Sequence, residues 1–96
     1  MADLTKLSDL HAATEKSRVD FLLTDLGLCS TFVDLVKTER EMGDREAANR
    51  ILKKAETAYA TMARMLPDVE NADQKHEFNQ KLTKLRARLD HEQGLS

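Results

Sequence analysis

Three segments of the chain repeat apolar residues at intervals of three and four, which is the spacing of one face of an α-helix. The middle segment keeps this spacing from Ala48 to Leu66 and is the most regular of the three. The last segment repeats large apolar residues at spacings of four, three and four between Phe78 and Leu89. Such a narrow seam is typical of antiparallel bundles and coiled coils. The pattern predicts an all-α protein without strands.

Local signals mark the starts of the second and third helices. Gly43 can take the left-handed conformation that ends a helix, and Asp44 follows it as an N-cap. We therefore expect the second helix over residues 44 to 66. Pro67 disfavours helix at the residue before it, and Asn71 with Gln74 is a capping-box signal. The third helix is expected over residues 71 to 92.

The first helical region carries two apolar lines. The line expected to face the core contains Val19, Leu22, Leu23, Leu26, Cys29, Val33 and Val36. A second line, formed by Phe21, Leu28, Phe32 and Leu35, lies about 100° or more away around the same helix. It has three explanations: the amino-terminal segment folds over it, two chains pair through it, or it binds another partner.

Residues 3 to 42 form either one long helix or two. Caps at Thr14 or Ser17 would place a break near residues 14 to 17. Gly27 offers a second break, because glycine inside a helix costs about 1 kcal/mol relative to alanine.

These patterns together predict an antiparallel three-helix bundle that forms one domain over residues 1 to 96. The core is expected to contain Leu22, Leu26, Val33, Val36, Ile51, Leu52, Ala55, Tyr59, Met62, Phe78, Leu82, Leu85 and Leu89.

Composition fits a helical protein and narrows the function classes. Residues with charged side chains make up 33% of the chain, and it contains only three Gly and one Pro. The formal net charge of −2 attracts neither nucleic acid nor an anionic membrane. The first residues show no targeting pattern and no segment resembles a membrane span, so we expect a cytoplasmic protein.

Few side chains suggest chemistry. Cys29 is the only cysteine and lies in the most apolar stretch, so it is interpreted as a small buried residue. Asp73 and His76 share one face of the third helix and are the alternative metal-binding pair, although the apolar faces of the first two helices offer no matching carboxylates. No glycine-rich phosphate loop and no nucleophile motif occur, so no cofactor and no enzymatic activity are expected.

The third helix offers another alternative function, that of a weak nucleic-acid binder. Lys81, Lys84 and Arg88 follow one edge, with Lys75 a turn earlier. The acidic residues Glu77, Asp90 and Glu92 lie on the same helix, and there is no exposed aromatic ladder. The charged residues of this helix are therefore interpreted as solvated faces with ion pairs.

The segment Phe32 to Ala55 resembles one tetratricopeptide-type helical hairpin. The matching positions are Phe32, Leu35, Gly43, Asp44, Ala48, Leu52 and Ala55, whereas Val36, Glu39 and Ala60 depart from the repeat. A hairpin followed by one more helix is also similar in architecture to the microtubule-interacting and transport domain. Both resemblances imply a module that binds other proteins and performs no chemistry.

The sequence therefore predicts a non-enzymatic protein-interaction or scaffold module that self-associates as a homodimer. Phe21, Leu28, Phe32 and Leu35 are the expected self-association residues.

Overall fold

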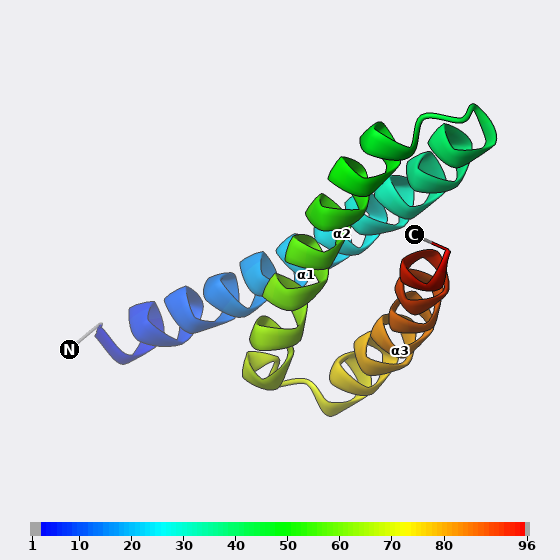
Figure 1. Cartoon of the computed structure of the whole chain (residues 1–96). Coiled ribbons are helices and arrows are strands. Elements are labelled where there is room, and N and C mark those ends of the chain that lie inside the picture. Colours follow the sequence, from blue (N-terminus) through cyan, green and yellow to red (C-terminus); the bar gives the residue numbers. More distant parts are fainter. Residues whose placement is uncertain (1–2, 96) are drawn as a thin grey trace.

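The structure, a computed structural model, describes the backbone of residues 3–95 and the side chains of residues 14–95. Its helices are α1 (Asp3–Glu41), α2 (Arg45–Met65) and α3 (Ala72–Gly94), with a short 3-10 turn, η1 (Leu66–Asp68), before α3. The helices α1 and α2 form an antiparallel hairpin, and α3 runs back along one side of it (Figure 1). The prediction of an all-α three-helix bundle is confirmed for the described residues.

Helix α1 is continuous and does not break at residues 14 to 17 or at Gly27. Gly27 is exposed, and a Cβ added there would meet no atom within 4 Å. Apolar residues before and after it, such as Leu22 and Val33, are buried on one side and hold the helix straight through this position. Residues 3–13 therefore continue α1 away from the hairpin (Figure 1) and do not fold back over the second apolar line, which was one of the three explanations for it.

The α1–α2 turn has the predicted chemistry. Gly43 has a φ of 81°, a left-handed conformation that favours glycine. The amides of Gly43 and Asp44 donate to the carbonyls of Arg40 and Glu39 at 3.0 and 2.9 Å, which is the Schellman pattern. The Asp44 carboxylate then accepts a hydrogen bond from the Ala47 amide at 3.0 Å and caps α2. These bonds fix where the hairpin reverses.

The α2–α3 connection is tied to α1. Asn71 caps α3 by accepting a hydrogen bond from the Gln74 amide at 3.0 Å. Arg18 donates to the Asp68 carbonyl at 2.9 Å, and Glu15 accepts from the Glu70 amide at 3.0 Å. These contacts, together with the burial of Val69, attach the connection to the long helix.

The core is closest to the sequence expectation where α1 meets α2. Ala48 and Ala55 are fully buried, and the Cys29 thiol donates to the Ala55 carbonyl at 3.3 Å. Small side chains let the two helices approach closely. The interpretation of Cys29 as a small buried residue is confirmed.

Most of the predicted core residues are buried, with a few corrections. Leu26, Ile51 and Tyr59 are only partly buried and pack against the edge of the core. Leu23 was expected on the core face but is 49% exposed, because it lies about 100° around α1 from the fully buried Leu22. Glu92 was expected on a solvated face of the third helix but is buried, because it forms an ion pair with Arg40 of α1.

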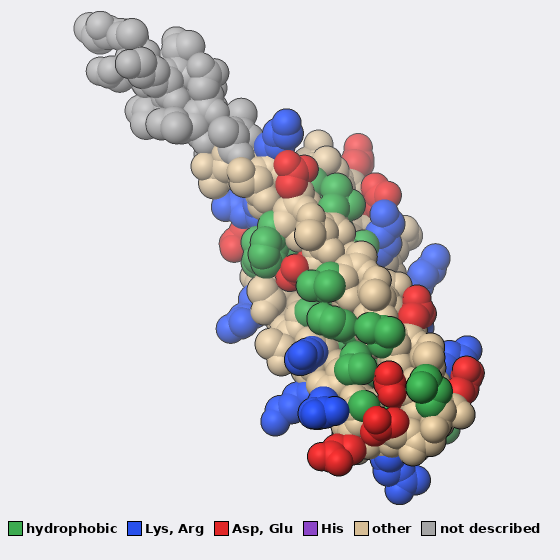
Figure 2. All heavy atoms as spheres, turned by 90° about the horizontal axis from the view of Figure 1, so that it is seen from above, with side chains coloured by type: hydrophobic (Ala, Val, Ile, Leu, Met, Phe, Trp, Pro, Cys, Tyr) green, Lys and Arg blue, Asp and Glu red, His purple; other side chains and the backbone are tan. Residues whose placement is uncertain are grey.

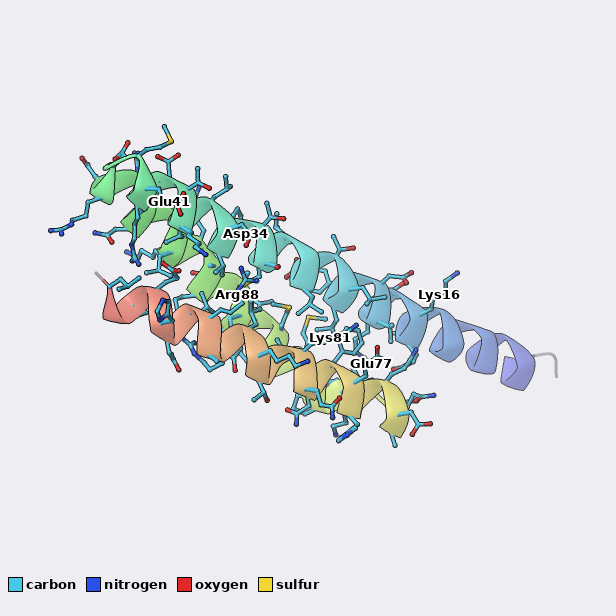
Figure 3. The ribbon with its side chains drawn as sticks, turned by 90° about the vertical axis from the view of Figure 1, so that its right-hand side faces the viewer. Lys16, Asp34, Glu41, Glu77, Lys81 and Arg88 are labelled. Carbon is cyan, nitrogen blue, oxygen red and sulfur yellow. The ribbon has the colours of Figure 1, made fainter. Side chains whose placement is uncertain are left out.

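Helix α3 is attached to the hairpin by its apolar seam and by ion pairs. Phe78, Leu82, Leu85 and Leu89 are buried. Arg40 of α1 binds the buried Glu92 at 2.6 Å. Asp34 of α1 and Arg88 of α3 face each other between the two helices (Figure 3), and Arg88 also donates to the Ser30 hydroxyl at 3.0 Å. One face of the hairpin is therefore covered.

Candidate functional site

The second apolar line of α1 (Phe21, Leu28, Phe32 and Leu35) lies on the side of the helix turned away from α3. It is on the far side of α1 from Ser30 and Asp34, which contact α3. Phe21, Leu28 and Leu35 are 41%, 46% and 41% exposed. Figure 2 shows one face of the molecule on which hydrophobic side chains gather along the middle, with charged side chains on both sides. We call the face of the hairpin that carries this line the open face.

Phe32 differs from the other three residues of the line. Its side chain is partly buried and packs against the core. It also lines a shallow hollow of about 490 Å³ with Arg50, Lys53, Lys54 and Thr57 of α2. The apolar surface therefore extends from α1 to the aliphatic stems of side chains on α2. Such stems can cover apolar surface while their charged ends remain in water.

The line is part of two interleaved rows with a seven-residue repeat. Phe21, Leu28 and Leu35 form one row, and Phe32 lies in the other row between Asp25 and Glu39. A seven-residue repeat keeps side chains on one seam of a helix, as in coiled coils. Asp25 and Glu39 are half-buried, and within residues 14–95 neither forms an ion pair. The apolar line is thus bordered by carboxylates on α1.

The α2 side of the open face is basic. Arg50 and Lys54 are exposed, lie four residues apart, and form no ion pair with any described residue. Sequence reasoning missed these residues because they belong to a different helix from the line. Only the register of the hairpin, fixed at Cys29 and Ala55, brings them beside Phe32.

The alternative metal site gains no third ligand in the described part of the chain. His76 is exposed and lies 3.2 Å from the side-chain nitrogen of Gln80, while Asp73 is in the first turn of α3. Among the described residues, no group of three or more His, Cys, Asp or Glu side chains could hold a metal ion.

The basic edge of α3 is partly engaged in ion pairs. Lys81 pairs with Glu77 at 3.2 Å along the helix (Figure 3), and Arg88 pairs with Asp34. Arg86, on the same helix, binds Glu56 and Asp90 and stacks 4.8 Å from the centre of the Tyr59 ring. The hydrogen bonds with Arg86 lower the pKa of Glu56, although its burial acts in the opposite direction.

Cys29 lacks the features of a reactive cysteine. Its side chain is fully buried, and this burial, with smaller contributions from Glu56 and Asp25, raises the pKa of the thiol to about 11. A neutral, inaccessible thiol is a poor nucleophile.

Comparisons of the chain with known protein families, with curated proteins and with solved structures find no match. The resemblance to a tetratricopeptide-type hairpin therefore remains a prediction. Within the described part of the chain, no helix has both the length and the apolar character needed to span a bilayer.

Proposed function

We propose that this chain is a non-enzymatic protein-interaction module that self-associates through the open face of the α1–α2 hairpin. The observation that carries the proposal is the exposure of Phe21, Leu28 and Leu35 as one row, directly beside the hollow at Phe32. Scattered exposed leucines are ordinary, but an apolar row with a repeat is a feature of interfaces.

The fold supports this proposal by removing one of the competing explanations. Since α1 continues unbroken to Asp3, its first turns do not cover the line, and α3 lies on the other face. A second copy or another protein remains as the cover. The expectation of a cytoplasmic homodimer belongs to this proposal and remains a prediction.

A pair of matched leucine variants tests the proposal. Leu28 and Leu23 lie on the same helix and are 46% and 49% exposed, but only Leu28 is on the open face. Leu28→Asp is expected to convert the dimer to a monomer, because a carboxylate would be desolvated in the interface. Leu23→Asp is expected to leave the dimer intact. Analytical ultracentrifugation gives the mass, and circular dichroism checks that both variants keep their helix content.

The same experiment can overturn the proposal. It fails if the unaltered chain is monomeric, or if Leu28→Asp associates as strongly as the unaltered chain while remaining helical. These variants are preferred to Phe32→Asp, since Phe32 also packs against the core and its replacement would alter folding.

A further inference from the structure

We propose that the self-association interface pairs α1 of each copy with α2 of the other, so that the carboxylates beside Phe32 meet Arg50 and Lys54 across a two-fold axis. This inference rests on the proposed function and specifies its partner and its geometry. It is carried by the charges that border the open face.

Pairing α1 with α1 of the second copy brings like charges together. Asp25 and Glu39 lie seven residues on either side of Phe32. In an antiparallel pair centred on Phe32, Asp25 of one copy lies opposite Glu39 of the other. In a parallel pair, Asp25 meets Asp25 and Glu39 meets Glu39. Either arrangement desolvates carboxylates against each other, which disfavours the contact.

Pairing α1 with α2 of the second copy brings opposite charges together. A two-fold axis parallel to the helices places α1 of one copy over α2 of the other, with both hairpin turns at the same end. Arg50 is nearer the turn than Lys54, and Glu39 is nearer the turn than Asp25. Because Cys29 is level with Ala55, Glu39 and Arg50 differ in level by about five residues, as do Asp25 and Lys54, and the long basic side chains can span this offset of about 7 Å. None of these four side chains has an ion-pair partner among the described residues.

The same arrangement fills the hollow beside Phe32. The hollow lies between α1 and α2 and is lined by the stems of Arg50, Lys53 and Lys54. With α1 of the second copy over α2, an apolar side chain of its line enters this hollow, and the basic head groups stay at the rim. An apolar centre with a charged rim is the usual anatomy of a protein interface.

Two complementary charge-reversal variants test the pairing. The basic side is reversed in Arg50→Glu/Lys54→Glu, and the acidic side in Asp25→Lys/Glu39→Lys. Each variant alone is expected to self-associate at least tenfold more weakly than the unaltered chain at low salt, where surface charges act most strongly. Mixed in equal amounts, the two variants are expected to form a heterodimer, because each α1 then faces an α2 of opposite charge. Ultracentrifugation of each variant and of the mixture gives the three masses, and circular dichroism checks their folding.

The result for the basic-side variant alone decides between the two pairings. If Arg50→Glu/Lys54→Glu self-associates as strongly as the unaltered chain, α2 is not in the interface and the proposed pairing is overturned. Failure of the mixture to associate, with both variants helical, also overturns it. Leu28→Asp, measured in parallel, distinguishes failure of the proposed function from failure of the proposed pairing. If Leu28→Asp dissociates the dimer while the charge variants do not, the proposed function stands and only the pairing fails. If the unaltered chain is monomeric, both the proposed function and the proposed pairing are contradicted.

Discussion

Both faces of the α1–α2 hairpin carry apolar side chains of α1, and the two faces differ in what covers them. On one face, Leu82, Leu85 and Leu89 of α3 are buried against the hairpin, and the Arg40–Glu92 pair closes the end. On the other face, leucine and phenylalanine side chains of α1 remain exposed beside charges that form no ion pair with any described residue. Within the described part of the chain, α3 covers one face and no other element covers the open face. The proposed self-association would supply a second layer on the open face.

The largest expected contrast is between one leucine on each face. Leu89→Ala removes a fully buried side chain of the covered face and is expected to lower the free energy of unfolding by about 2–5 kcal/mol. Leu28→Ala truncates an exposed side chain and is expected to cost less than about 1 kcal/mol in dilute protein. Urea unfolding followed by circular dichroism measures both. Equal losses of unfolding free energy in the two variants would contradict the difference in burial between the two faces.

The next contrast is between two carboxylates. Glu92→Ala leaves the Arg40 guanidinium in a mostly buried place without its carboxylate, which is expected to cost about 3 kcal/mol. Glu39→Ala, on the open face, removes a carboxylate that has no ion pair within residues 14–95 and is expected to change stability by about 0.5 kcal/mol or less. Chemical denaturation compares the two variants. The double variant Arg40→Met/Glu92→Met should recover much of the loss, and its failure to do so would argue for a role of Glu92 beyond the pair.

Substitutions at two glycines test the α1–α2 turn and the continuity of α1. Gly43→Ala is expected to cost about 1 kcal/mol, because alanine is strained at the left-handed φ of the hairpin turn. Gly27→Ala is expected to raise the free energy of unfolding by about 0.5–1 kcal/mol, because Gly27 is helical and has room for a Cβ. Thermal unfolding curves report the sign of each change. A stabilising Gly43→Ala would contradict the observed turn.

The smallest expected effect is a pH dependence on the covered side. Arg86 lowers the pKa of Glu56 in the folded protein relative to the unfolded chain. This stabilisation is fully present above the unfolded pKa of about 4.3 and is lost as the pH falls through the lower folded value. Stability of the unaltered chain should therefore fall more steeply below about pH 4.5 than stability of Glu56→Gln. Parallel curves of stability against pH for the two proteins would show that the Glu56–Arg86 contact does not make stability depend on pH.

The helices and their ends followed from local signals. Gly43, Asp44, Pro67 and Asn71 act within a few residues of themselves, so the sequence locates the turn and the caps to within one or two residues. Continuity of α1 was harder to predict, because Gly27 weakens a helix by an amount that tertiary burial on the neighbouring turns can offset.

The open face was only half predictable. The spacing of Phe21, Leu28 and Leu35 identified an apolar line from one helix alone. Its neighbours Arg50 and Lys54 depend on the lateral register of α1 and α2, which no local pattern encodes. Leu23 was misplaced for a related reason: adjacent residues on a helix diverge by about 100°, and the width of the buried stripe is set by the helices that pack on it.

The solution mass of the unaltered chain tests the central claim most directly. Light scattering coupled to size exclusion, at several protein concentrations, is expected to give twice the mass of one chain at the higher concentrations and a fall toward one mass on dilution. A single-chain mass at every concentration would contradict the account, since the open face would then have no second copy to cover it.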